Sequence, residues 1–301
     1  MDQLFKRYSD IIPDFNAFQE SLQAPLPQHL RVNTLKIEVQ QLLDALENKG
    51  IHLTNASHSE APIFLAPEGS SAGKWLEYAL GYIHPQALTS CLASIFLAPE
   101  PGSYVLDLCA APGGKTSHIA QLMEGRGLVV ANELRRSRHV PLSHTLGRLG
   151  VMNAVLTSYP AQEFPLKQRF DFVMADVPCS GEGTIRTNHK HHGAWKKLAK
   201  GNLLQTQKRM ILRGFDLLRE SGEMLYATCT YDPCENESVV DFLLRNRDAR
   251  LLSIDSPLPF SSGLSGWLKE TYDRTMQRAA RFYPHLVDSV GFFMARIGRR
   301  G

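Results

Sequence analysis

The 301-residue sequence predicts an α/β fold, in which a parallel sheet with crossover helices follows a small N-terminal α/β module. From Gly102 onward, short apolar runs alternate with amphipathic segments, which is typical of strands joined by helices. Hydrophobic residues make up 43% of the chain and charged residues 21%, the composition of an ordinary globular protein. A change of pattern and a Pro/Gly break between Tyr82 and Gly102 divide the two regions.

The N-terminal region predicts a module of its own. We interpret "HLRVNTLK" as a strand, "VQQLLDALENKG" as a helix that Gly50 ends, and "IHL" as a further strand. The stretch "HPQALTSCLASIFLAPEPG" predicts a helix followed by a break. We therefore predict two domains, residues 1–85 and 86–301.

The C-terminal region predicts the sheet and its helices. Six apolar runs are expected to be strands: Tyr104 to Cys109, Leu128 to Glu133, Asn153 to Thr157, Phe170 to Asp176, Met224 to Cys229 and Gly291 to Ile297. Four segments are expected to be helices: about Lys115 to Met123, Ser137 to Leu149, Leu203 to Arg219 and Pro233 to Asn246. The last helix has a start signal, with Asp232 as cap, Pro233 next and Glu235 three residues after the cap.

Composition argues against several classes of protein. No stretch approaches the roughly 18 apolar residues of a membrane span, and the N-terminus lacks a signal peptide. The five cysteines are odd in number and scattered, with no CxxC pair, which argues against a disulfide framework or a zinc site. We expect a cytoplasmic protein that binds no metal and no membrane.

Positive charge is concentrated in residues 185–213, which contain no Asp or Glu. The segment has eight basic residues: Arg186, Lys190, Lys196, Lys197, Lys200, Lys208, Arg209 and Arg213. A solvated helix face is one interpretation. We favour a surface for a polyanion, with Arg186, Lys190, Lys196 and Lys197 as RNA-binding residues.

The stretch "VLDLCAAPGGKTSHIA" predicts a ligand loop between a strand and a helix. Ligands bind beyond the carboxyl ends of such strands, where the helix offers unpaired amides. Neither the nucleoside triphosphate pattern nor G-x-G-x-x-G is present. Glu133, at the next strand end, can accept both hydroxyls of a ribose, so a ribose without a phosphate cradle favours S-adenosylmethionine. A plain strand-to-helix turn remains the alternative.

Two cysteines follow neighbouring strand ends, Cys179 in "ADVPCSGEGT" and Cys229 in "ATCTYDPCENE". Each alone is more often a buried structural thiol. Together, beside Asp176, they fit methyl transfer to a pyrimidine C5, because that carbon is not nucleophilic until a thiolate adds at C6. Cys229 precedes a helix start that could activate it, and Cys234 is a weaker rival by the same argument.

These motifs, with "LDLCAAPGGKT", resemble the Sun-type (Fmu-type) RNA 5-methylcytosine methyltransferase family. The resemblance runs from "RVNTLK" to "RFYPHLVDSVGFFMARI". It implies a class I (Rossmann-like) methyltransferase domain behind an RRM-like RNA-binding module, and an enzyme that methylates structured rRNA or tRNA, acts as a monomer and does not use DNA. A non-catalytic RNA-binding or ribosome-assembly factor on the same fold is the alternative function.

The resemblance also implies roles for individual residues. It makes Cys229 the nucleophile and Cys179 the residue that assists product release. Asp176, which could hydrogen-bond the exocyclic amine or N3 of the base, and Lys115 complete the catalytic set that we expect. The implied S-adenosylmethionine contacts are Cys109, Ala110, Ala111, Pro112, Gly113, Gly114, Lys115, Glu133 and Asp176. The family's usual aspartate after the third strand is absent in "LTSYPAQEF", so Ser158 or a backbone amide is expected to contact the adenine. The cluster of His189, His191 and His192 is interpreted as an RNA-facing loop.

Overall fold

The computed structural model describes residues 5–56, 61–187 and 200–300, without the side chains of 200 and 201. Its main element is a nine-stranded sheet in the order β11-β14-β15-β9-β8-β5-β6-β7, with β10 pairing with β15. The strands are β5 (Tyr104–Asp107), β6 (Leu128–Asn132), β7 (Ala154–Thr157), β8 (Phe170–Asp176), β9 (Leu218–Thr228), β10 (Ala249–Leu252), β11 (Ser261–Ser262), β14 (Ala280–Phe282) and β15 (Phe292–Arg299).

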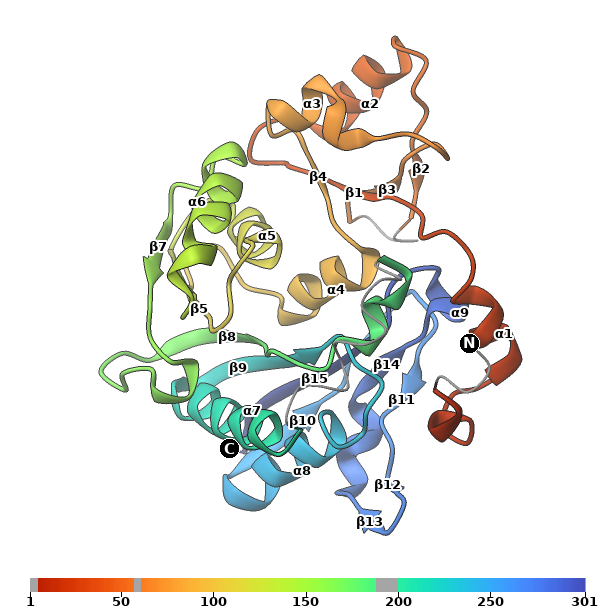
Figure 1. Cartoon of the computed structure of the whole chain (residues 1–301). Helices are drawn as coiled ribbons and strands as arrows, with labels where there is room; N and C mark the ends of the chain where they lie inside the picture. The colour runs from red at the N-terminus through yellow and green to blue at the C-terminus, as the bar shows by residue number, and fades with distance from the viewer. Residues whose placement is uncertain (1–4, 57–60, 188–199, 301) are drawn as a thin grey trace.

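The five strands β5 to β9 are parallel, and β15 runs antiparallel to β9. Helices cover both faces of this sheet, so β8 and β9 are apolar over long runs rather than alternating. Figure 1 shows α4, α5 and α6 on one face and α7 and α8 on the other. The helices are α4 (Leu88–Leu97), α5 (Gly114–Leu122), α6 (His139–Arg148), α7 (Lys200–Asp216), α8 (Glu237–Asn246) and the short α9 (Pro284–Val287). All five parallel strands therefore end at one edge, where the site lies.

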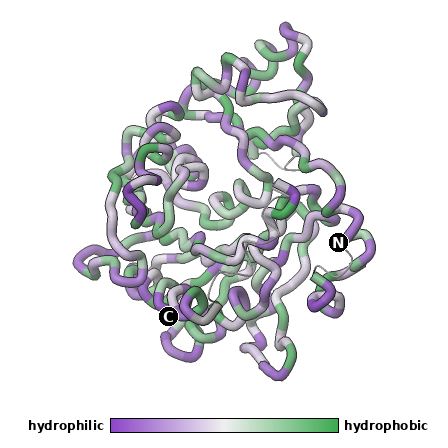
Figure 2. Tube along the Cα trace, viewed as in Figure 1, coloured by the Kyte–Doolittle hydropathy of each residue, from purple (hydrophilic) through white to green (hydrophobic). Residues whose placement is uncertain are grey.

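The small module has an antiparallel sheet in the order β2-β3-β1-β4. Its elements are β1 (His29–Val32), α2 (Val39–Glu47), β2 (Thr54–Asn55), β3 (Ile63–Leu65), α3 (Leu76–Ala79) and β4 (Ile83–Pro85). Apolar residues of β1, α2, β3 and β4 form its own core. In Figure 2 hydrophilic residues follow the outer turns of the molecule, while hydrophobic segments run through the interior.

The first residues do not pack within this module. Helix α1 (Phe15–Ser21) and the segment before it lie against α9, far from β2 and β3 (Figure 1). Phe18 contacts the rings of Tyr231 and Tyr283, and Tyr8 donates its hydroxyl to Glu182 at 2.8 Å. These partners lie in the segments that follow β8, β9 and β14, and the division at residues 1–85 and 86–301 stays a prediction.

Several element predictions are corrected by the structure. The "IHL" strand is wrong: the Ile51 amide still bonds to the Leu46 carbonyl at the end of α2, and pairing starts at Thr54. Helix α7 ends at Asp216 rather than Arg219, because Leu218 already begins β9. The short hairpin of β12 (Gly266–Trp267) and β13 (Glu270–Thr271) was not predicted.

The predicted start of the last helix at Pro233 is also wrong. Residues 232–235 form a turn in which Asp232 accepts from the Cys234 amide at 3.0 Å, and α8 begins only at Glu237. Asn236 occupies the cap position but turns its side chain back to Thr228 and Thr230. No helix among the described residues is long and apolar enough to cross a membrane.

Candidate functional site

Two cavities open at the carboxyl edge of the parallel strands. The thiol cavity, of about 340 Å³, is lined by His84, Pro85, Gln86, Ala87, Ser90, Asp107, Cys109, Ala110, Ala111, Pro112, Gly114, Lys115, Asp176, Thr184, Thr187, Cys229, Val290 and Phe292. The Glu133 cavity, of about 290 Å³, is lined by Leu108, Cys109, Asn132, Glu133, Leu134, Arg135, Arg138, Ala161, Gln162, Pro178, Thr206 and Met210. Cys109 lines both, so the two cavities meet at the loop that follows β5.

Asp107, which is 1% exposed, fixes the loop from Cys109 to Gly114. Thr116 donates its hydroxyl to Asp107 at 2.7 Å, and the Cys109 amide donates at 3.2 Å. Gly113 adopts φ 104°, a conformation that L side chains rarely adopt, as the chain turns into α5. Burial raises the pKa of Asp107 to about 6, with the Asp176 charge adding to the rise.

Lys115 and Asp176 form an ion pair at 2.7 Å inside the thiol cavity. Burial lowers the pKa of Lys115, but the charge and hydrogen bond of Asp176, with Cys229 and Asp107, outweigh it and raise the pKa overall. The ammonium also lies 5.1 Å from the ring centroid of Phe292. Lys115 is therefore a fixed cation beside the thiols.

The two thiols that follow β8 and β9 meet. Cys179 Sγ lies 3.2 Å from Cys229 Sγ, and the Cys229 amide donates to Cys179 Sγ at 3.3 Å. The hydrogen bond to Cys229 and burial raise the pKa of Cys179 well above its usual range, helped by Glu235 and Asp176. Cys179 therefore remains a protonated thiol beside Cys229. Cys229 lines the thiol cavity, whereas Cys234 lines neither cavity.

The Cys179 loop is fixed by side chains of α7 and of the turn before α8. Glu235 accepts from the Ser180 amide at 3.0 Å and from Gln207 Nε2 at 2.8 Å, and Gln207 also donates to the Pro178 carbonyl. The Gly183 amide donates to the Cys229 carbonyl at 2.8 Å, which joins the two loops. The thiols are thus positioned by hydrogen bonds rather than by a helix start, because α8 begins only at Glu237, eight residues beyond Cys229.

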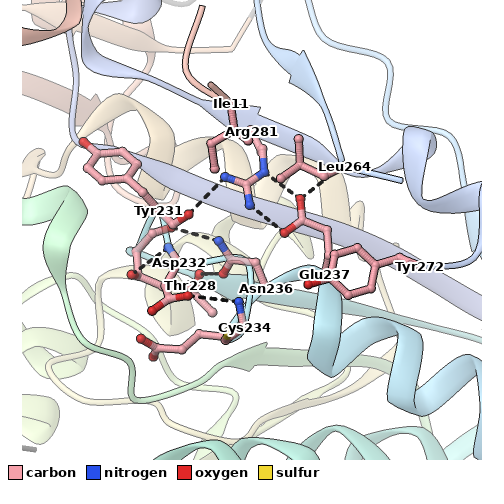
Figure 3. Close-up of polar contacts among 12 residues, drawn as sticks. Ile11, Thr228, Tyr231, Asp232, Cys234, Asn236, Glu237, Leu264, Tyr272 and Arg281 are labelled. Atoms are coloured by element: carbon pink, nitrogen blue, oxygen red, sulfur yellow. Dashed lines mark hydrogen bonds and ion pairs between the residues drawn. The ribbon is translucent and has the colours of Figure 1, made fainter. Parts of the chain in front are cut away.

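The chain after Cys229 is anchored by a buried ion pair (Figure 3). Arg281 of β14 donates to both oxygens of Glu237, at 2.6 and 2.5 Å, and to the Tyr231 carbonyl at 3.1 Å. Glu237 also accepts from the Leu264 amide at 3.1 Å. This pairing satisfies both charged groups and holds the turn that carries Tyr231.

Glu133 lies in its cavity with partners already in place. It accepts from the Arg135 amide at 2.8 Å and pairs with Arg138 at 3.1 Å, and Arg138 also donates to the Ala111 carbonyl at 2.7 Å. Ser158 lines neither cavity, and its hydroxyl donates to the Leu134 carbonyl at 3.3 Å. Ala161 and Gln162 line the wall of the Glu133 cavity instead.

The prediction that Arg186 binds RNA is corrected. Its side chain is 1% exposed, donates to the carbonyls of Ala24 and Pro25, and pairs with Asp288 at 2.8 Å. Residues Lys190, Lys196 and Lys197 and the histidine cluster fall outside the described residues. Of the other basic residues, Arg209 pairs with Glu163, which offsets its charge, and Arg213 donates to the Gln162 carbonyl.

Sequence reasoning missed His84, Gln86 and Asp107 as cavity residues. His84 and Gln86 lie where the module joins the sheet, so only the packing of two distant segments brings them to the thiols. Asp107 had a local signal, since it ends the strand before the ligand loop. Within the described residues no cluster of three or more His, Cys, Asp or Glu side chains could hold a metal.

Parallel strands in this order, with a ligand loop after the first strand and an acidic residue after the second, define a Rossmann-like methyltransferase. The antiparallel sheet β2-β3-β1-β4 of the small module is that of a ferredoxin-like N-terminal domain. Residues 94–298 match the model of the 16S rRNA methyltransferase RsmB/F family, and residues 2–70 match the ferredoxin-like domain of RsmF/B-like methyltransferases. The chain belongs to this RsmB/F family, as the resemblance to Sun-type enzymes predicted.

Three similar proteins set the scale of this relationship. The chain is 35% identical over 98% of its length to the tRNA (cytosine(49)-C(5))-methyltransferase of Pyrococcus abyssi and covers 95% of that protein. It is 33% identical over 98% of its length to the human 28S rRNA (cytosine(4447)-C(5))-methyltransferase, of which it covers 37%. A methyltransferase homologue from Pyrococcus horikoshii has a similar structure, with a TM-score of 0.87, 32% identity and coverage of 100% and 95%.

Proposed function

We propose that the protein is an S-adenosylmethionine-dependent RNA (cytosine-C5)-methyltransferase that acts through a covalent cysteine–C6 intermediate. The observation that carries the proposal is the pair of thiols at 3.2 Å beside the Lys115–Asp176 ion pair. The relatives named as rRNA and tRNA cytosine-C5-methyltransferases support the same reaction. The RNA is rRNA or tRNA, and the same proposal includes a monomer that acts in the cytoplasm and not on DNA.

The residues at the two cavities fit S-adenosylmethionine. Glu133 offers a buried carboxylate that can accept from the ribose hydroxyls while it remains paired with Arg138. The loop from Cys109 to Gly114 joins the two cavities without bulky side chains, so a ligand can lie along its backbone. The bound cofactor supplies the methyl group.

The chain's own residues account for the activation of C5. The Cys229 thiolate adds to C6 of the cytosine, and the electron pair moves through C5 to N3, which makes C5 nucleophilic. Asp176 would hydrogen-bond the exocyclic amine, and Lys115 beside it favours negative charge as it develops on the ring. After C5 takes the methyl group, a base from solvent removes the C5 proton, the electron pair of that C–H bond forms the C5–C6 double bond again, and the Cys229 sulfur departs as thiolate.

Cys179 is proposed to assist that last stage. Its proton is retained because its pKa is raised, so it can donate S–H to the departing Cys229 sulfur at 3.2 Å. The alternative, a non-catalytic RNA-binding factor, would bind RNA without transferring methyl groups. Incorporation of tritiated methyl groups into total RNA separates the two functions.

The division of labour between the thiols gives a sharp experiment. Cys229→Ala should abolish methylation and form no adduct, because C5 is never activated. Cys179→Ala should still attack and methylate but fail to release its product. The measurement is an RNA-dependent, slowly migrating protein band on a denaturing gel, present for Cys179→Ala and absent for Cys229→Ala and the double variant. Trapping in Cys229→Ala would reverse the roles, and activity in both variants without an adduct would exclude the covalent mechanism.

A further inference from the structure

One end of the thiol cavity is formed where the module meets the sheet. His84 lies in β4, Gln86 follows that strand, and both line the cavity together with Ser90 and with Gly114 at the start of α5. Neither His84 nor Gln86 has a part in the chemistry proposed above. Each accepts a hydrogen bond from an arginine that does not line the cavity.

Gln86 has a fixed amide orientation. Arg31 Nε donates to Gln86 Oε1 at 3.2 Å, and a guanidinium has only donors, so it selects the oxygen of the amide. The nitrogen of Gln86 is then directed to the side of Ser90, to whose hydroxyl it lies at 3.4 Å. Because Ser90 also lines the cavity, Gln86 presents N–H at this wall.

His84 has a fixed tautomer for the same reason. Arg148 Nη2 donates to His84 Nδ1 at 2.9 Å, so Nδ1 is the acceptor and the proton lies on Nε2. Burial, with the charges of Arg31 and Arg148, lowers the pKa of His84 to about 3, which keeps the ring neutral. A Cβ placed on Gly114 would lie 3.4 Å from His84 Nε2, so this second N–H reaches the start of α5.

The charge behind this wall is positive and lacks a buried anion. Arg31 is 0% exposed, and its side-chain partners are the neutral groups of Gln86, Gln121 and Ser117. Arg148 donates to backbone carbonyls and to His84. Among the described residues neither arginine forms an ion pair with a carboxylate. The N-terminus of α5 adds a positive partial charge at the same place.

We infer that this end of the thiol cavity is an anion subsite that binds the α-carboxylate of the methionine half of S-adenosylmethionine, with Gln86 and His84 as its oriented donors. The inference rests on the proposed function. With the ribose at Glu133, the amino-acid half must extend past Cys109, the residue common to both cavities, and so reaches this wall. Asp176, in the same cavity, is paired with Lys115. Asp107, the other carboxyl group that lines the cavity, accepts from the Thr116 hydroxyl, and burial raises its pKa to about 6.

The experiment compares two ligands that share the adenosine and differ in the amino acid. S-adenosylhomocysteine carries the α-carboxylate, whereas 5′-methylthioadenosine lacks it. Calorimetry on the full chain without RNA should show that Gln86→Glu weakens S-adenosylhomocysteine at least about tenfold, since a charge-assisted hydrogen bond is lost and a repelling charge is added. Binding of 5′-methylthioadenosine should change by less than about twofold. The new carboxylate faces Arg31, so the variant retains its fold.

Two control variants separate this contact from general damage. Gln121→Glu places the same charge on another amide partner of Arg31 that lines neither cavity, and it should leave the ratio of the two affinities unchanged. Glu133→Ala should weaken both ligands equally, because both carry the ribose. An equal loss of both ligands in Gln86→Glu, or no loss of either, overturns the subsite. Unchanged ligand binding with loss of RNA methylation assigns Gln86 to the RNA and also overturns it. Failure of the wild-type chain to bind either ligand would instead contradict the proposed cofactor.

Discussion

Two of the buried arginines, Arg281 and Arg31, have their charges compensated in opposite ways. Arg281 in β14 is 2% exposed and donates to both oxygens of Glu237, whereas Arg31 in β1 is 0% exposed and donates only to neutral groups. Burial opposes both charges. The Glu237 charge overcomes it and raises the pKa of Arg281, while burial lowers the pKa of Arg31 to about 10.

The difference indicates two uses of a buried cation. Glu237 compensates the charge of Arg281, and Arg281 also holds the turn after Cys229 (Figure 3). The charge of Arg31 remains uncompensated by protein and acts on the wall of the thiol cavity through Gln86. Removing each arginine by the same substitution tests this contrast.

The largest effect is expected for Arg281→Met. The substitution leaves Glu237 buried without its partner, which costs about 3–5 kcal/mol of the free energy of unfolding. Chemical denaturation measures it. Arg209→Met is the matched control, because the Arg209–Glu163 pair is more than half exposed and should contribute at most about 1 kcal/mol. Equal costs for the two variants would show that the buried pair does not anchor this region.

A buried carboxylate extends the comparison to pH. The pKa of Asp107 is higher in the folded protein, at about 6, than its ordinary value of 3.8, so its contribution to stability is present at low pH and lost as the pH rises through about 6. The Asp107→Asn variant has no carboxyl group to ionise at this position, so it does not lose this contribution as the pH rises. The stability of the variant relative to the wild type should therefore rise by about 2–3 kcal/mol between about pH 4 and pH 7.5. A relative stability that does not change with pH would contradict the raised pKa.

The smallest loss is expected for Arg31→Met. The variant leaves neutral acceptors rather than a carboxylate, and it also removes the cost of a buried charge. We expect a loss of about 1–2 kcal/mol in the free energy of unfolding, less than for Arg281→Met. Denaturation under identical conditions compares the two. A larger loss for Arg31→Met would show that the joint between module and sheet, rather than charge compensation, dominates.

Much of the fold could be predicted because its signals are local. The apolar runs of β5, β6, β8 and β9 and the crossover helices between them follow from short periodic patterns. The site predicted at the edge of the sheet also follows, because parallel strands end on one side. Cys179 and Cys229 therefore come together as expected, although the roles assigned to them remain a proposal.

What failed depended on long-range contacts. The run of basic residues predicted that Arg186 is an exposed RNA contact, yet it is buried against the segment 24–25 and Asp288. The last helix starts at Glu237 rather than Pro233, because Asn236 bonds back to the end of β9. A charged residue or a capping residue can be recognised in the sequence, but the group that it will pair with in the folded protein cannot.

The sequence by itself determined six strands of the sheet, the crossover helices, the ligand loop and the two cysteines, because each of these patterns lies within a short stretch of chain. Only the tertiary structure decided which charged residues are compensated. Arg31 lies 55 positions before Gln86, and Arg281 lies 44 positions after Glu237, so neither pairing has a sequence signal. Whether a buried cation meets a carboxylate or an amide is set by the packing of segments from distant parts of the chain, and this packing places the positive wall beside the thiols.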